Sequence, residues 1–324
     1  MLVTEILLHD YITDWNLDQL FKSNTFLQQS QPNYPLVATC TTGLTPPNKI
    51  SRDFFVENKR KGRPSELSTT NRDSIVSYVA DKLQLTGMVN TVAAECSGST
   101  YALYTATMTS LILNTPVFVF CADNMIADEL QMWRFKSFGA LDQETGRPFD
   151  DTSNGFRMGV GAALFLIKHP NVRHSLSACA TISNYNFYTN PSLIANPGSH
   201  DTLINNLHGI DFNTIDLWNA HATGTNVGDK FQYDVFTKLV KHDAPIVGYK
   251  GYVGHCVAAS GAVEICMSFE DYKNNQLRPN NILGNTIVDD DRIITTPTTF
   301  DYRRILKANF GFGGKNVICQ IDIQ

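Results

Sequence analysis

The sequence has no long apolar run and no basic leader. No hydrophobic stretch in its 324 residues reaches the roughly 18 to 20 residues that a membrane-spanning helix needs. The opening segment, MLVTEILLHDYITDW, contains acidic residues and lacks the basic region of a secretory signal peptide. These absences predict a cytoplasmic protein without a membrane span.

Paired cysteines and an excess of positive charge are also missing. The seven cysteines include no C-x-x-C pair, and Cys and His residues are not paired at the spacing of zinc ligands. We therefore expect free thiols in a reducing compartment and no metal. The net charge of −5 argues against a general nucleic-acid-binding protein, whose domains carry a basic face.

Short apolar segments alternate with helix-like segments over much of the chain. Residues 91–95 and 116–123 predict buried strands, and residues 97–113 between them predict a buried helix. Residues 183–215 are polar and include a predicted loop at 190–201, and residues 1–60 show a mixed pattern. The C-terminal part repeats the strand, loop and helix plan in four segments, 212–226, 229–240, 244–273 and 303–322. This alternation predicts an α/β fold.

One cysteine stands at a predicted strand-to-helix turn, in the stretch TVAAECSGSTYAL. A helix N-terminus stabilises a thiolate through its free N–H groups and its positive dipole end, so Cys96 is a candidate nucleophile. The small residues beside it would let a substrate approach the backbone. Taken alone, the segment favours a buried core cysteine, because free cysteines are among the most buried residues.

Two later segments each place a histidine at the edge of a predicted element. In NAHATGTNVGD, His221 ends an apolar strand and Thr223 and Thr225 follow in a loop, although an ordinary turn would read the same way. In YKGYVGHCVAASGAVE, His255 precedes a helix rich in Ala and Gly, a composition that also suits tight helix packing.

The segment NFGFGGKN, residues 309–316, alternates Gly and Phe. Such a loop offers free backbone N–H groups beside a bulky apolar side chain, and a simple glycine-rich hairpin is the alternative. A phosphate-binding loop is a poor interpretation because the Gly-Lys-Ser/Thr ending is absent.

Together and in this order, these segments resemble the elongating β-ketoacyl-acyl-carrier-protein synthases, the ketosynthases of the thiolase superfamily. The segment GRPFDDTSNGFRMGVGAA adds to the resemblance, which runs from about residue 46 to the C-terminus. It implies a thiolase fold, with two similar α/β halves in a five-layer αβαβα core, and usually a dimer. The halves would be residues 1–170, with the nucleophilic cysteine, and residues 171–324, with both catalytic histidines.

The resemblance also implies roles for individual residues. The Cys-His-His triad of the family corresponds to Cys96, His221 and His255, and Lys250 and Glu264 match a charged pair around the second histidine. The oxyanion hole corresponds to the backbone N–H groups of Cys96 and Phe312. The implied substrate-binding residues are Thr223, Thr225, Phe310, Phe312, which matches the gating phenylalanine, and Gly313.

The implied reaction is a decarboxylative Claisen condensation in fatty-acid or polyketide biosynthesis. An acyl group on Cys96 would react with a malonyl-type extender carried on the phosphopantetheine of an acyl carrier protein, and no cofactor would be bound. Two alternatives remain: a partner subunit like the chain-length factors of heterodimeric ketosynthases, or an acyltransferase of the same fold. The basic stretch KRKGR, residues 59–63, could steer an acidic carrier protein or be an ordinary solvated loop.

The chain departs from the family pattern at several points. It is shorter than expected, and the stretch between Lys168 and Ile215 looks trimmed. Glu95 replaces a small apolar residue, Val160 stands in place of a Glu, and Gln232 stands in place of another. A carboxylate beside a thiolate raises the thiol pKa, so we expect Glu95 to point away from the pocket, toward a dimer interface or a basic partner.

Overall fold

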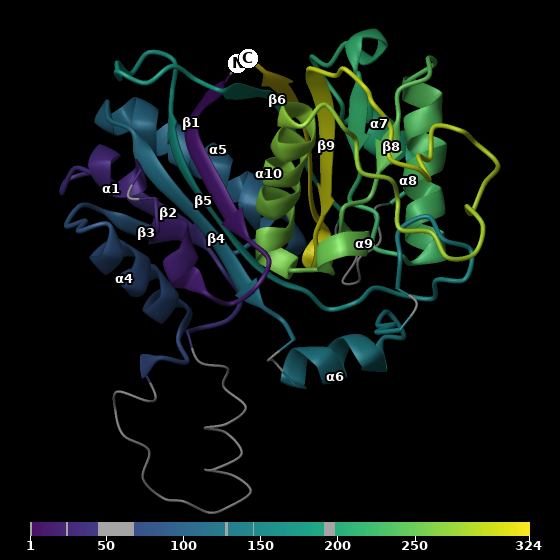
Figure 1. Ribbon diagram of the computed structural model, residues 1–324, viewed down its shortest axis with the longest axis horizontal. Coiled ribbons are helices and arrows are strands. Elements are labelled where there is room, and N and C mark those ends of the chain that lie inside the picture. Colours follow the sequence, from purple (N-terminus) through teal and green to yellow (C-terminus); the bar gives the residue numbers. More distant parts are fainter. Residues whose placement is uncertain (1, 24, 45–67, 127–128, 145, 191–197) are drawn as a thin grey trace, which may run out of the picture.

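The computed structural model describes residues 2–23, 25–44, 68–126, 129–144, 146–190 and 198–324 (Figure 1). The basic stretch at 59–63 lies outside these ranges. Within them, a single sheet of ten strands runs in the order β3-β2-β4-β5-β1-β6-β10-β9-β7-β8. The strands are β1 (Thr4–Ile12), β2 (Leu36–Thr39), β3 (Val89–Thr91), β4 (Val117–Asn124), β5 (Val160–Lys168), β6 (Ala180–Thr189), β7 (Leu217–Asn219), β8 (Ile246–Val247), β9 (Arg304–Phe310) and β10 (Lys315–Ile323).

The sheet consists of two halves with the same topology. In the first half, β2 pairs in parallel with β3 and β4, and β5 pairs antiparallel with β4 and β1. In the second half, β7 pairs in parallel with β8 and β9, and β10 pairs antiparallel with β9 and β6. The halves join where β1 meets β6. The predicted boundary at residue 170 falls in the connection between β5 and β6.

Helices form the other layers. The helices α5 (Gly98–Leu113) and α10 (Ser260–Lys273) lie between the two half-sheets, and each packs on strands of the sheet and on the other (Figure 1). Outside the halves lie α4 (Arg72–Lys82), with α1 (Thr25–Gln29), on one side and α8 (Asn226–Leu239), with α7 (His200–Asn205), on the other. The predicted αβαβα layering is confirmed.

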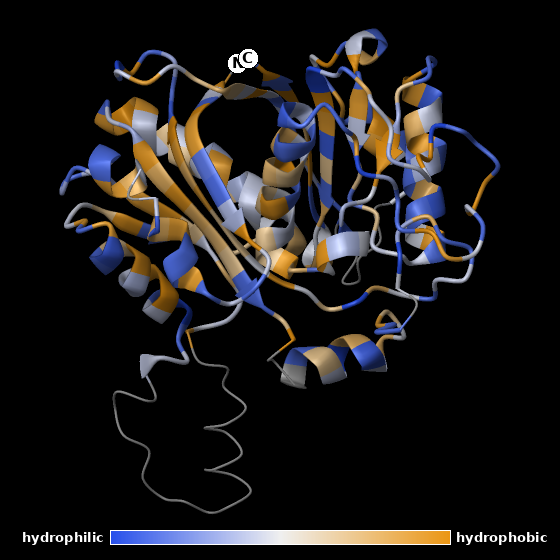
Figure 2. Ribbon diagram, in the orientation of Figure 1, coloured by the Kyte–Doolittle hydropathy of each residue, from blue (hydrophilic) through white to orange (hydrophobic). Residues whose placement is uncertain are grey.

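The sequence pattern explains this layering. The strands β4 and β5 are almost wholly buried and read as continuous apolar runs, as expected for strands covered on both faces (Figure 2). The middle helix α5 combines apolar residues with small Ser, Thr and Ala, which lets the two layers of sheet approach it closely. None of the described helices is long and apolar enough to cross a membrane.

One expectation from the sequence was wrong: the strand predicted over residues 91–95 ends at Thr91, and a 3-10 turn begins at Glu95. Two central strands lie where the sequence pattern identified no strand. The polar residues 183–215 include most of β6, whose Asn186 side chain bonds the backbone of Asn184 and His208 and so tolerates a central position. The mixed N-terminal region contains β1, which also lies in the middle of the sheet.

Candidate active site

Cys96 lies in a sharp turn at the start of α5. The turn is a 3-10 segment, Glu95–Ser97, and Glu95 adopts φ 46°, a left-handed conformation that is unfavourable for a residue with a Cβ. The second half repeats this turn before α10, where Val257 has φ 40°. Strained backbone of this kind persists at sites where the surrounding structure holds it in place.

Side chains next to Cys96 fix the turn to the last strands. The Ser97 hydroxyl donates to the carbonyl of Lys315 at 2.7 Å and lies 3.2 Å from that of Asn309. Thr100 donates to the Asn309 side chain at 3.0 Å. Gly98 has no room for a Cβ, which would lie 2.4 Å from the Thr39 hydroxyl and 3.1 Å from the Cβ of Ala258. The N-terminal ends of α5 and α10 therefore meet in the centre of the molecule.

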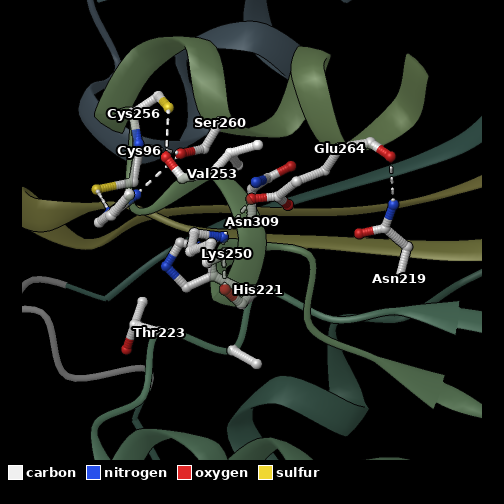
Figure 3. Close-up of polar contacts among 12 residues, drawn as sticks. Cys96, Asn219, His221, Thr223, Lys250, Val253, Cys256, Ser260, Glu264 and Asn309 are labelled. Carbon is white, nitrogen blue, oxygen red and sulfur yellow. Dashed lines mark hydrogen bonds and ion pairs between the residues drawn. The ribbon is translucent and has the colours of Figure 1, made fainter. Parts of the chain in front are cut away.

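His255 faces the cysteine. Its Nε2 lies 3.1 Å from Sγ of Cys96, and its Nδ1 lies 2.9 Å from the Ser260 hydroxyl. That hydroxyl accepts the backbone N–H of Cys256 at 2.9 Å, which directs its own hydrogen toward Nδ1 (Figure 3). We assign the hydrogen of the imidazole to Nε2 on this basis, so His255 presents a donor to the cavity.

His221 presents its ring beside that of His255, with centroids 5.6 Å apart. The Lys250 ammonium donates to the His221 carbonyl at 2.6 Å and lies 3.4 Å from its Nδ1. An ammonium has only hydrogens to offer, so Nδ1 of His221 accepts and its Nε2 carries the hydrogen. Lys250 also pairs with Glu264 at 2.7 Å (Figure 3).

Burial and positive charge keep both imidazoles uncharged. Burial lowers the pKa of His221 and of His255 well below the usual value, and the Lys250 ammonium lowers both further. At neutral pH the two rings are therefore neutral N–H donors. Donors of this kind stabilise a negative oxygen without first bringing a charge of their own into the cavity.

The thiol of Cys96 is protonated at rest. Burial raises its pKa to about 12, and the Glu95 carboxylate contributes to the rise. Lys250 and the backbone N–H groups of Phe312 and of Cys96 itself act in the opposite direction. The two backbone N–H groups thus point at the reacting sulfur, where an oxyanion hole is expected from the sequence.

The Phe312 ring lines the cavity beside Cys96 and packs against two other aromatic rings. Its half-buried ring contacts Phe135 at 5.4 Å between centroids and stacks on Phe138 at 6.5 Å, and both of these belong to α6 (Glu129–Ser137) and the turn after it. Gly314, two residues on, has φ 74°, and a Cβ there would lie 1.7 Å from the Asn190 carbonyl. Only glycine allows the loop to fold under the phenylalanine in this way.

The cavity itself is small and mainly apolar. It measures about 70 Å³, and its lining includes Cys96, Phe156, His221, Thr223, His255 and Phe312. Phe310 and Gln232 also line it, whereas Thr225 lies 3.0 Å from the Thr223 hydroxyl and Gly313 is exposed at the loop. The structure therefore brings the predicted triad and most of the predicted binding residues together.

Asp229 builds the threonine loop. Its carboxylate accepts the backbone N–H groups of Thr223, Gly224 and Phe149 at 2.9 to 3.0 Å. Gln232, the substitution noted in the sequence, accepts the N–H of Ala222 at 3.2 Å and so continues the same support. Burial raises the pKa of Asp229 to about 6, against these hydrogen bonds.

The segment at 146–159 holds both histidine loops in place. Ser153 donates to the Gly224 carbonyl at 2.6 Å, next to the first loop. The Arg157 carbonyl accepts the N–H of His255 at 2.7 Å, and Gly159 donates back to the His255 carbonyl at 3.0 Å. The segment that supported the family resemblance is thus the scaffold shared by His221 and His255.

Two departures from the family pattern have clear positions. Val160 begins β5 opposite Asn124, and the acidic partner of Lys250 is Glu264 instead. Glu95 is half-buried, and among the described residues it neither lines the cavity nor bonds the Cys96 sulfur. That arrangement agrees with a side chain turned from the pocket, and its expected partner stays a prediction.

Sequence reasoning missed several supporting residues. Ser260 sets the tautomer of His255, and Lys307 and Asn219 complete the buried cluster around Glu264. Lysine in the middle of an apolar strand was the available signal for Lys307. In the described ranges, no three His, Cys, Asp or Glu side chains are grouped to hold a metal ion.

Comparison with known proteins agrees with this geometry. The N-terminal domain model of β-ketoacyl synthases matches residues 26–171, and the C-terminal domain model matches residues 178–282. A 3-oxoacyl-[acyl-carrier-protein] synthase 2 of Mycobacterium leprae is 33% identical over 184 residues, 53% of this chain and 44% of that protein. A non-reducing polyketide synthase of Talaromyces marneffei is 26% identical over 292 residues, 81% of this chain and 11% of the synthase. The chain spans less than half the length of these relatives.

Solved structures show the same fold. A β-ketoacyl synthase from Burkholderia phymatum superposes with a TM-score of 0.79 at 19% identity, over 95% of this chain and 79% of that one. A ketosynthase in complex with its chain length factor, from Xenorhabdus doucetiae, also gives 0.79, at 16% identity over 95% and 79% of the two chains.

Proposed function

The chain belongs to the β-ketoacyl synthase family, and from this premise we propose that it is a β-ketoacyl-acyl-carrier-protein synthase of fatty-acid or polyketide biosynthesis. One observation carries the proposal: Nε2 of His255 lies 3.1 Å from Sγ of Cys96, while His221 and His255 are both buried and uncharged. A nucleophile beside two neutral N–H donors suits a reaction in which a thioester attack alternates with enolate formation.

In the first step, the sulfur of Cys96 attacks an acyl thioester on the phosphopantetheine of an acyl carrier protein. The bond between the acyl carbon and pantetheine sulfur breaks, and the thiol proton of Cys96 ends on that departing sulfur. The backbone N–H groups of Cys96 and Phe312 stabilise the tetrahedral oxyanion, and losing one such donor typically costs about 10² to 10³ in rate.

In the second step, a malonyl group on the carrier loses carbon dioxide. The electron pair of the broken carbon–carbon bond becomes an enolate, whose oxygen receives hydrogen bonds from Nε2 of His221 and of His255. The enolate carbon then attacks the acyl group on Cys96, the bond to sulfur breaks, and the thiolate takes up a proton from solvent. Thr223 and Thr225 hold the pantetheine arm, and Phe312 closes over it.

The surface supports an oligomeric partner. Within the described residues β3 is an edge strand of the sheet, and the last turns of α5 expose apolar side chains, with Ile112 73% accessible. Edges and apolar patches of this kind are normally covered. We propose a dimer, with a second copy or a ketosynthase-like partner, acting in the cytoplasm.

Acyl transfer and decarboxylation give direct tests. Incubation with acylated carrier protein should add the acyl mass to wild-type protein, and none to Cys96→Ala. Carbon dioxide release from malonyl-carrier protein should fall by at least about 10² in His255→Ala. No adduct with any acyl carrier would reject the enzyme in favour of a silent partner subunit, and an adduct without decarboxylation would favour an acyltransferase.

A further inference from the structure

Lys307 is a buried ionisable residue that the proposed steps leave unused. It comes from β9, its side chain is fully buried, and its ammonium donates to Oδ1 of Asn219 at 2.8 Å. It also pairs with Oε2 of Glu264. Burying a charged side chain is costly unless a partner of opposite charge is present. The partner of Lys307 is Glu264, whose carboxylate already pairs with Lys250 through Oε1.

Two ammoniums therefore share one carboxylate in the centre of the molecule. Lys250, Glu264 and Lys307 are at most 2% exposed, so this three-residue cluster has two ammoniums and one carboxylate. The next carboxylate that acts on it is that of buried Asp229, through Lys250 and not through Lys307. The elements packed around Lys307 bring other polar groups to it: Glu264 from α10, Lys250 from α9 (Lys250–Val253), the amide of Asn219 from β7 and the thiol of Cys319 from β10.

The cluster ends at the imidazoles. Lys250 forms an ion pair with Glu264, and its ammonium also donates to the carbonyl of His221 and lies 3.4 Å from Nδ1 of the same residue. Asn219 is held in turn, since its amide donates to the Glu264 carbonyl at 3.0 Å (Figure 3). The same amide donates to the Ser268 hydroxyl at 2.8 Å. Any group that fixes Glu264 therefore fixes the donor that sets the tautomer of His221.

We propose that Lys307 is a positioning residue: it binds the Glu264 carboxylate oxygen that Lys250 leaves free, holds Lys250 against His221 through that carboxylate, and places a second buried ammonium near both imidazoles. The reaction this serves rests on the proposed function, whereas the charge arrangement does not. Lys307 touches no reacting atom, so it acts only through Glu264, Lys250 and the field at the two rings.

The electrostatics agree with this role. Besides burial and Lys250, the Lys307 ammonium lowers the pKa of His221 and of His255. Burial, together with Lys250, lowers the pKa of Lys307 itself to about 8, while Glu264 opposes this change. The ammonium is therefore mostly charged at neutral pH, where it acts on the rings.

The test combines two substitutions with a matched control. Lys307→Met removes the charge and the hydrogen bonds but keeps a side chain of similar length. Lys307→Gln keeps an N–H donor for Glu264 without the charge. Lys168→Met is the control, because Lys168 is also buried and paired with a glutamate, Glu5, but stands at the far end of β5, nine residues from Gly159, which bonds His255. At about 3.3 Å per residue, that places it roughly 30 Å from the site.

The first measurement is a ¹⁵N-histidine NMR titration, with the two signals assigned through His221→Gln and His255→Gln. We expect the pKa of both imidazoles to rise by at least about half a unit in both Lys307 variants, and to stay unchanged in Lys168→Met. This readout needs no substrate. Unshifted titrations in a folded Lys307→Met or Lys307→Gln protein would overturn the proposal.

The second measurement is decarboxylation of malonyl-carrier protein against pH. We expect about a tenfold loss in Lys307→Met, an acid limb moved to higher pH, and partial recovery in Lys307→Gln, while alkylation of Cys96 by iodoacetamide stays within about twofold. An equal loss of alkylation and decarboxylation would indicate general disruption and count against positioning. Shifted NMR titrations in a protein whose wild type releases no carbon dioxide would reject the proposed function and leave the role of Lys307 intact.

Discussion

Ser260 decides which nitrogen of His255 carries the hydrogen. Its hydroxyl accepts the N–H of Cys256 and faces Nδ1 of the ring, both at 2.9 Å. The residue is small, buried and easily taken for helix packing in the sequence. The nitrogen that His255 presents as a donor thus depends on Ser260, whose hydroxyl bonds His255 and Cys256 and not the Cys96 sulfur.

Replacing Ser260 with Ala should lower decarboxylation more than acylation. Without the hydroxyl, Nδ1 loses its donor and the Nε2–H tautomer is no longer favoured, a loss of about 1 kcal/mol or roughly fivefold to tenfold in rate. The measurement is carbon dioxide release beside acyl adduct formation on Cys96. Ser110→Ala, which removes a buried serine hydroxyl that donates to the Thr115 carbonyl, is the control. Equal losses in both assays would contradict the assignment.

The pH dependence of stability should reveal Lys307. Its pKa is about 8 in the folded protein, below the ordinary value near 10.5, so the unfolded chain binds more protons between those values. Folding stability should therefore rise from pH 8 toward pH 10 through this residue, by no more than about 1.4 kcal/mol per pH unit.

Urea unfolding of wild type and Lys307→Met at pH 7.5 and pH 9.5 measures this effect. We expect the free energy of unfolding of the wild type to improve relative to the variant at the higher pH. A difference that stays constant between the two pH values would show that Lys307 keeps an ordinary pKa.

Among the elements, α5 and α10 have the most direct effect on the site. Each begins after a turn that contains a left-handed residue, Glu95 or Val257, and their N-terminal ends meet at the centre. The helix lengths and apolar character could be predicted from sequence. The turns could not, because neither a glutamate nor a β-branched valine favours a positive φ; packing against the opposite helix imposes it.

The helix α6 lies beside the gating phenylalanine and exposes large apolar side chains. Trp133 is 67% and Phe138 62% accessible, and exposed Arg134 and Lys136 lie between them. Apolar side chains flanked by positive charge suit the acidic carrier protein of the proposed function, whose arm would pass Phe312.

Trp133→Ala should therefore raise KM for the carrier protein. We expect a threefold to tenfold increase, about 1 kcal/mol, with kcat for a small thioester mimic unchanged, because α6 supplies no reacting group. Steady-state kinetics with carrier-bound and small substrates separate the two effects. Equal KM values for wild type and variant with the carrier would remove α6 from the docking surface.

At the scale of the whole molecule, two equivalent half-sheets bring chemically different turns together. The first half contributes the nucleophile before α5, and the second contributes His255 at the corresponding place before α10. The same doubling leaves β3 at one edge of the sheet and an apolar end of α5 in solvent.

Ile112→Arg should weaken the proposed dimer. A buried arginine at an apolar interface costs several kcal/mol unless it finds a partner, enough to shift a micromolar dimer to monomer. Size-exclusion chromatography with light scattering gives the mass directly. Leu283→Arg, at another exposed apolar position, should leave the mass unchanged. A dimer that withstands the substitution at Ile112 would place the interface elsewhere.

The sequence by itself determined the α/β class through its alternation of strand-like and helix-like segments. Its resemblance to the ketosynthases implied the candidate nucleophile, both histidines and the lysine–glutamate pair, because four segments occur together in one order; each segment alone also fitted an ordinary structural role. The polar strand β6 and the N-terminal β1 escaped prediction because their place in the sheet depends on pairing with distant strands and on side-chain hydrogen bonds such as those of Asn186.

Only the tertiary structure decided the protonation and the support of the site. Cys96 and His255 are 159 positions apart, and Lys307 meets Glu264 across 43. The tautomers of the two histidines, the pKa shifts and the pairing of two ammoniums with Glu264 arise from burial and from distances of about 3 Å. These exist only after the two halves have folded against each other.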